Sequence, residues 1–179
     1  MSPAPFGELD RILRLLRKMD LPHALIGGWA VITWGFVRAS DDLDLMMELP
    51  VSRRKELLAA LAADYEAEWR DGGLDDPIPG LIRAAPRNEG GFPVDFLIAT
   101  SRADRAALSR AVEVTAEGVK IPVVRPEDLI AMKLEAGGGQ DYEDARRLLS
   151  TLAGKLDEKL LKESCSVRRV EDRLALLRR

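Results

Sequence analysis

A single aspartate inside an apolar segment constrains the fold of this chain more than any other feature. Asp95 interrupts the run Phe92–Ala99, where a buried carboxylate is costly unless a cation meets it. A second apolar segment begins where Asp42 and Asp44 flank Leu43. Because successive side chains of a strand point to opposite faces, Asp42 and Asp44 share one face. The two segments therefore predict neighbouring strands of one sheet, with carboxylates on a common face.

Three carboxylates on adjacent strands form a set that can hold two magnesium ions. Magnesium prefers hard oxygen ligands, and two such ions about 4 Å apart can activate an attacking oxygen and stabilise a leaving one. Simpler structural explanations stay open. Asp42 and Asp44 could belong to a solvated turn, and Asp95 could lie on an edge strand with its carboxylate facing water.

A glycine pair follows another short apolar run. Gly27 and Gly28 come after Ala24–Ile26, and residues 29–36 have the pattern of a helix. Glycines at such a joint let the backbone approach a ligand closely, and the following helix offers free N–H groups to a phosphate. The segment matches neither the dinucleotide-binding fingerprint nor the Walker A pattern. Alone, the pair is equally compatible with a tight turn.

A lysine is expected on the apolar face of a helix that begins at Pro126. Lys133 shares that face with Leu129, Ile130 and Leu134, so its ammonium must reach solvent, pair with a carboxylate or meet a phosphate. The next helix carries two aspartates that recur with its apolar residues and therefore also face inward: Asp141 and Asp144. They could pair with Lys133 or Arg38, or they could orient an acceptor.

The order of the elements predicts an α/β fold, with a small mixed β-sheet flanked by helices and a helical C-terminal region. We expect an α/β core at residues 1–124 and helices packed on it at residues 125–179. Two hairpins are predicted, residues 81–84 with 94–97 and residues 112–115 with 119–123. Residues 71–77 are rich in turn formers and predict a mobile flap. Helix breaks are expected near 137–139, 154 and 164.

Composition limits the classes of function. The 179 residues carry a net charge of −3, which argues against a surface built mainly for nucleic acid, so any basic patch must be local. The single cysteine, Cys165, excludes an internal disulfide and favours a reducing, cytoplasmic setting. The single histidine, His23, excludes a multi-histidine metal site. We expect no membrane span and no signal peptide.

Taken together, these motifs resemble the nucleotidyltransferase superfamily with the polymerase-β-like core, whose simplest members are the MNT-type proteins. The resemblance is carried by Leu25–Gly28, by Arg38–Asp44 and by Val94–Leu97. It is closer to the AbiEii-like and MenT-like branch of toxin–antitoxin systems, through Lys133–Ala136 and Gln140–Asp144. It covers about residues 21–152. The chain differs from that branch in its linker, where Gly137–Gln140 stands in place of a basic residue.

The resemblance implies an enzyme that moves a nucleoside monophosphate from a triphosphate to an acceptor hydroxyl. Asp42 and Asp44 would hold two magnesium ions, and Asp95 would bind one ion and help deprotonate the acceptor. Five residues would bind the nucleotide and its phosphates: Gly27, Gly28, Arg38, Ser40 and Lys133. Asp141 and Asp144 would serve the acceptor or the structure.

The acceptor is not determined by these motifs. Three possibilities share the same core: a toxin that modifies tRNA, an antitoxin that modifies its cognate toxin, and an antibiotic-modifying enzyme that acts on a small molecule. The AbiEii-like motifs favour the toxin class. A non-catalytic member that binds nucleotide or a protein partner is a fourth possibility, which the three carboxylates disfavour because a protein without catalysis has no need of so costly a cluster.

Overall fold

The computed structural model describes residues 4–36, 38–71 and 80–178. Within them one mixed sheet of seven strands has the order β3-β4-β5-β2-β1-β7-β6. The strands are β1 (His23–Leu25), β2 (Leu43–Met47), β3 (Tyr65–Asp71), β4 (Gly80–Pro86), β5 (Val94–Ile98), β6 (Val112–Ala116) and β7 (Val119–Val123). The pairs β2–β5 and β1–β7 are parallel, and the other neighbours are antiparallel. The predicted α/β fold is confirmed.

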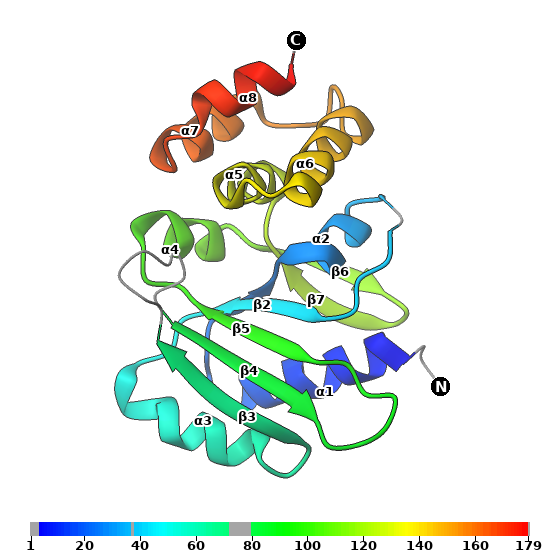
Figure 1. Ribbon diagram of the computed structural model, residues 1–179, viewed down its shortest axis with the longest axis vertical. Coiled ribbons are helices and arrows are strands. Elements are labelled where there is room, and N and C mark those ends of the chain that lie inside the picture. The colour runs from blue at the N-terminus through cyan, green and yellow to red at the C-terminus, as the bar shows by residue number, and fades with distance from the viewer. Residues whose placement is uncertain (1–3, 37, 72–79, 179) are drawn as a thin grey trace.

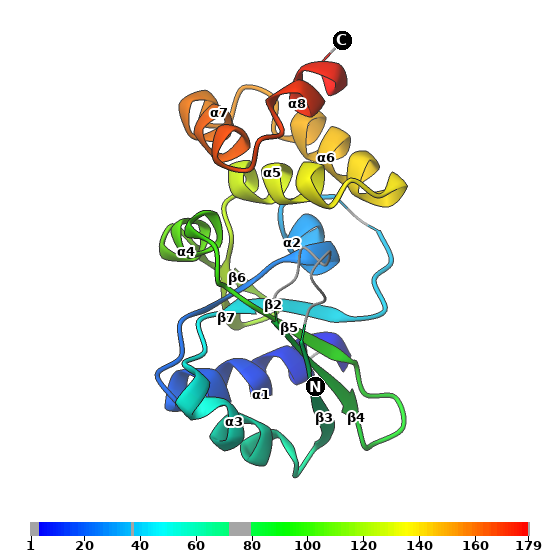
Figure 2. The same ribbon diagram turned by 60° about the vertical axis from the view of Figure 1, so that its left-hand side comes forward.

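Helices cover both faces of the sheet (Figures 1 and 2). On one face lie α1 (Ala4–Lys18) and α3 (Arg54–Leu61), which follows the 3-10 turn η1 (Val51–Arg53). On the other lie α2 (Gly27–Thr33), α4 (Arg102–Ser109) and α5 (Pro126–Ala136). Beyond α5 are α6 (Gly139–Thr151), α7 (Glu158–Val167) and α8 (Glu171–Leu177). The predicted carboxylates lie on the face of the sheet that is turned toward α5.

Alternation along the central strands separates the core from the candidate site. Leu43 and Leu45 of β2 and Phe96 of β5 are completely buried, whereas Asp44 and Asp95 point to the opposite face. An apolar stripe along α1, with the residue that follows the helix, is also buried: Leu9, Ile12, Leu13, Leu16 and Met19. One apolar core therefore fixes the register of the strands that carry the carboxylates.

The register places the two key aspartates beside each other. Asp44 pairs with Asp95 across the parallel strands β2 and β5. Because β5 lies between β4 and β2, it is a central strand, and the edge-strand alternative for Asp95 is wrong. The predicted hairpins are confirmed as β4–β5 and β6–β7. The predicted flap at residues 71–77 falls almost entirely outside the described residues, except for Asp71 at the end of β3.

Two expected helix boundaries are displaced by a few residues. The helix after β1 begins at Gly27, not after the glycine pair, and it ends at Thr33. The break expected near Ser164 lies a few residues later, at residues 168–170 between α7 and α8. The Ser164 hydroxyl donates to the buried carboxylate of Asp128 at 2.8 Å, so this hydroxyl bonds to another helix.

The C-terminal helices are joined to the core by polar contacts as well as by apolar packing. Asp128 of α5 is 2% exposed and accepts hydrogen bonds from Arg110, which follows α4, and from Ser164 of α7. The division near residue 124 remains a prediction. Within the described ranges, no helix combines the length and the apolar character needed to span a membrane.

Candidate active site

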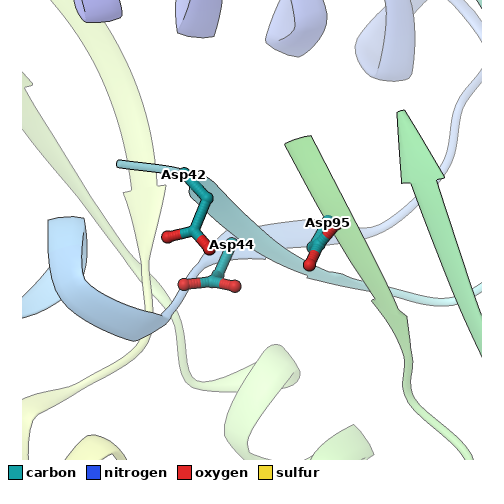
Figure 3. Close-up of side chains that lie close together, drawn as sticks. All are labelled: Asp42, Asp44 and Asp95. Atoms are coloured by element: carbon teal, nitrogen blue, oxygen red, sulfur yellow. The ribbon is translucent and has the colours of Figure 1, made fainter. Parts of the chain in front are cut away.

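Three carboxylates from two neighbouring strands meet on the α5 side of the sheet (Figure 3). Asp42 directly precedes β2, Asp44 lies in β2 and Asp95 lies in β5. Each offers an oxygen, and these oxygens all lie within 4.8 Å of one another. Hard oxygen donors so closely grouped fit the ligand preference of magnesium, so the residues present suit the ions that the sequence pattern implies.

The electrostatics of the cluster favour a cation. The pKa of Asp44 is raised to about 6, first by burial and then by the neighbouring charges of Asp42 and Asp95. Lys133 and the backbone N–H of Gly28 act in the opposite direction, but they do not cancel these effects. The three ionised carboxylates therefore repel one another, and a bound divalent cation would relieve that repulsion.

The buried Asp95 has a cationic partner that sequence reasoning did not identify. Arg83 of β4 lies opposite Asp95 in the register, and its Nε and Nη2 donate to Oδ1 and Oδ2, both at 3.1 Å. Asp95 is 8% exposed, so this bidentate pair supplies the cation that its burial requires. The sequence could have indicated this partner, because Arg83 is the one charged residue of the segment Leu81–Ala84, which the predicted hairpin pairs with the strand of Asp95.

The glycine pair is required by close packing at the site. A Cβ atom on Gly27 would lie 1.9 Å from Asp44 Oδ2, and the φ of Gly27 is +62°. A Cβ atom on Gly28 would lie 2.3 Å from Arg38 Nη2 and 2.5 Å from Ser40 Oγ. The two glycines therefore let a carboxylate and a cation lie directly against the backbone after β1.

Gly27→Ala should destabilise the protein by about 2–5 kcal/mol, from left-handed backbone strain plus the clash with Asp44. Gly118→Ala is a matched control, because Gly118 has a φ of +78° but a Cβ atom there would meet no other atom within 4 Å. It should lose only about 1–2 kcal/mol. Urea unfolding measures both. Equal losses would show that the space beside Asp44 is not restrictive.

Lys133 lies in a network of buried ion pairs. Its ammonium is 2.8 Å from Asp141 Oδ1 and 2.9 Å from Asp144 Oδ2. Burial alone would lower the pKa of Lys133, but hydrogen bonds to Asp141 and Asp144 outweigh it and raise the pKa. Arg38 Nε is 3.3 Å from Asp144 Oδ1, and Gln140 donates to the same oxygen. The pairing expected for the two aspartates is present.

The structure brings the predicted site residues into one connected cluster. Gly27 contacts Asp44, and Gly28 contacts Arg38 and Ser40. Ser40 also lies beside Asp42, with its hydroxyl 3.5 Å from the carboxylate. Arg38 pairs with Asp144, and Lys133 pairs with both Asp144 and Asp141. Asp95 lies beside Asp44 on the neighbouring strand. Sequence reasoning missed Arg83 and the contact that Gln140 makes with Asp144.

Solved structures with the same fold include nucleotidyltransferases. The antibiotic-resistance factor ANT(2'')-Ia aligns with a TM-score of 0.61 at 18% identity, covering 99% of this chain and 97% of that one. A nucleotidyltransferase-like antigenic protein from Paracoccidioides brasiliensis aligns with a TM-score of 0.58 at 17% identity, covering 99% and 93%. The lincosamide antibiotic adenylyltransferase LnuA aligns with a TM-score of 0.54 at 19% identity, covering 81% and 96%.

These identities are low, so the likeness establishes the fold and not the substrate. No curated protein matches the chain. The family model described as "Nucleotidyl transferase of unknown function (DUF2204)" matches residues 6–179. Because the match spans nearly the whole sequence and the fold agrees with it, this chain belongs to that family of nucleotidyltransferases.

Proposed function

We propose that the protein is a magnesium-dependent enzyme that transfers a nucleoside monophosphate from a nucleoside triphosphate to an acceptor hydroxyl. The observation that carries the proposal is the cluster of Asp42, Asp44 and Asp95, whose oxygens lie within 4.8 Å of one another. A partly buried cluster of like charges is costly without a cation, and its chemistry suits the divalent ions that such transfer uses.

Asp42 and Asp44 would hold two magnesium ions, and Asp95 would bind one of them. Bound magnesium would supply charge neutralisation for the phosphates and a more acidic acceptor hydroxyl. The acceptor oxygen forms a bond to the α-phosphorus while the bond to pyrophosphate breaks. The Asp95 carboxylate helps to take up the hydroxyl proton, and Arg83 fixes the orientation of that carboxylate through two hydrogen bonds.

The triphosphate would lie against Gly27, Gly28 and Ser40, with Arg38 and Lys133 balancing its charge. Both cations already face carboxylates, so phosphate oxygens would compete with Asp141 and Asp144 for them. Asp141 is 26% exposed, whereas Asp144 is fully buried. Lys133 is therefore expected to exchange Asp141 for phosphate while it keeps its contact with Asp144.

For the acceptor, we propose a toxin–antitoxin component that modifies tRNA or a partner protein. The support is the resemblance of Lys133–Ala136 and Gln140–Asp144 to the AbiEii-like and MenT-like branch. A small-molecule acceptor is the second candidate. It is supported by two of the similar structures, the antibiotic-resistance factor ANT(2'')-Ia and the lincosamide antibiotic adenylyltransferase LnuA. The match to ANT(2'')-Ia covers nearly the full length of both chains.

Incubation with magnesium, each labelled triphosphate in turn and total tRNA tests the proposal directly. Products are resolved on a denaturing gel, with protein alone in a parallel lane. Label on tRNA supports the toxin class, and label on protein alone supports self-modification or partner modification. Label that persists in Asp44→Asn would contradict the assigned site. Release of pyrophosphate only when a hydroxylated small molecule is added would support the second candidate.

Magnesium should raise the melting temperature more at about pH 8 than at about pH 5. The raised pKa of Asp44 makes its ionisation unfavourable to the folded state; the cost is absent below the ordinary pKa of 3.8 and fully present above about 6. Magnesium offsets that cost only where the carboxylate is ionised. Thermal unfolding across this pH range measures the effect. A shift that is equal at both pH values would contradict Asp44 as a ligand.

A further inference from the structure

A cavity of about 340 Å³ begins at the candidate site and extends between the sheet and the helices α4 and α5. Gly27, Asp44 and Lys133 line the part that adjoins the carboxylates. Met46 of β2 and Leu97 of β5 follow Asp44 and Asp95 by two residues, so they lie on the same face of the sheet. Both line the cavity and make this side of it apolar. Leu129 and Met132 of α5 add further apolar lining.

A second polar group lines the same cavity beyond the end of β5. It consists of Asp104 of α4, Glu135 of α5 and Arg168, the residue that follows α7. The Arg168 side chain is 5% exposed, and it donates to Asp104 Oδ1 at 2.8 Å and to Glu135 Oε2. The guanidinium therefore holds two carboxylates in place at this part of the cavity.

The two carboxylates have different roles. Asp104 is committed to the fold, because its other oxygen accepts from the Ser101 hydroxyl at 2.6 Å in the capping box of α4. Glu135 is 43% exposed, and its Oε1 has no hydrogen-bond partner among the described residues. Glu135 and Arg168 thus present an acceptor next to a donor group, with the acceptor free to bind a ligand.

The position of the cavity indicates which part of the substrate enters it. Of the five proposed phosphate contacts, Gly27 and Lys133 line the cavity at the end beside Asp44, whereas Gly28, Ser40 and Arg38 do not line it. In a triphosphate whose α-phosphate lies at Asp44, the nucleoside extends away from the other phosphates. From Asp44 the cavity continues along its apolar lining to Glu135 and Arg168, and apolar walls with a polar edge at Glu135 suit a planar base.

We propose that this cavity binds the nucleobase of the triphosphate and that Glu135, held by Arg168, selects bases with an exocyclic amino group. The inference rests on the proposed nucleotidyl transfer. An amino group donates to Glu135 Oε1, whereas an oxo group at the same place sets two acceptors face to face. A bound base that covers Glu135 removes water from Oε1, and an oxo group there supplies no donor in its place; this costs about 1–3 kcal/mol, which is roughly 5- to 150-fold in binding.

The test compares triphosphates that differ at this group. Non-hydrolysable analogues of CTP and UTP form one pair, and those of ATP and ITP form the other. Calorimetry with magnesium should show that the wild-type protein binds the amino member of at least one pair about 10- to 100-fold more tightly. In Glu135→Gln the ratio should fall to about threefold or less, because the new amide can donate to an oxo group.

Glu143→Gln is the matched control. Glu143 is 41% exposed, lies on α6, pairs with Arg147 and does not line the cavity, so the ratio should stay at the wild-type value. Equal binding within both pairs, or a ratio unchanged by Glu135→Gln, would overturn the inference. If binding still needs magnesium and Asp44, the proposed function survives that result. If no analogue binds at all, both proposals fail.

Discussion

Asp44→Asn is expected to abolish nucleotidyl transfer and, in the same protein, to raise the stability of the metal-free fold. Asp44 lies between Asp42 and Asp95, so its loss removes the carboxylate common to the proposed ion sites. Loss of several kcal/mol of charge stabilisation corresponds to a fall in rate of about a thousandfold or more. Label transfer from a triphosphate measures this loss.

The gain in stability has a separate cause. Burial and the charges of Asp42 and Asp95 raise the pKa of Asp44 to about 6, so ionisation at neutral pH disfavours the folded state. Raising the pKa of Asp44 from 3.8 to about 6 corresponds to roughly 3 kcal/mol, of which a neutral amide should recover about 1–3 kcal/mol. Urea unfolding without metal should show the gain at about pH 8 and little gain near pH 4, where the wild-type carboxyl is protonated.

Asp41→Asn is the matched control for both measurements. Asp41 is exposed, directly precedes Asp42 in the chain and is not part of the carboxylate cluster. This substitution should leave activity and stability near the wild-type values. An Asp44→Asn protein that retains transfer would contradict the proposed mechanism. One that is inactive but less stable than the wild type would show that Asp44 is held by contacts which outweigh the repulsion.

The central fold and most of the cluster could be predicted because short-range patterns specify them. The alternation around Asp44 and Asp95 identifies two strands with one polar face, and the burial cost of Asp95 implies a cationic partner. Lys133 and Asp144 could be assigned to inward faces from helical spacing alone. Each of these inferences depends only on residues within a few positions of one another.

The features that were missed depend on tertiary contacts. Arg83 is one of many arginines until the register of β4 and β5 places it opposite Asp95. The Ser164 hydroxyl favours a helix break only if it bonds locally, and here it bonds to Asp128 on another helix. The cavity edge formed by Glu135 and Arg168 joins residues 33 positions apart in the chain, which no local pattern reveals.

Asp144→Ala should cause a larger loss of stability than removal of any other carboxylate in the cluster, about 3–5 kcal/mol. The Asp144 side chain is fully buried and lies within ion-pair distance of both Lys133 and Arg38. Its removal leaves two cations with one fewer carboxylate in a desolvated site, and an uncompensated buried charge carries a penalty of this size. The midpoint and slope of urea unfolding measure the loss.

Asp141→Ala is the companion variant, because Asp141 binds the same ammonium but is 26% exposed. It should cost about 1 kcal/mol or less, as most partly solvated ion pairs do. Similar losses in the two variants would contradict a special structural role for Asp144.

A magnesium-bound triphosphate analogue should then raise the melting temperature of Asp144→Ala by more than that of the wild type. Its phosphate oxygens would meet Arg38 and Lys133, the two cations that the substitution leaves underneutralised. In the wild-type protein the same oxygens must compete with a carboxylate already in place. A smaller shift in the variant would instead mean that Asp144 is needed to hold the two cations where the phosphates bind.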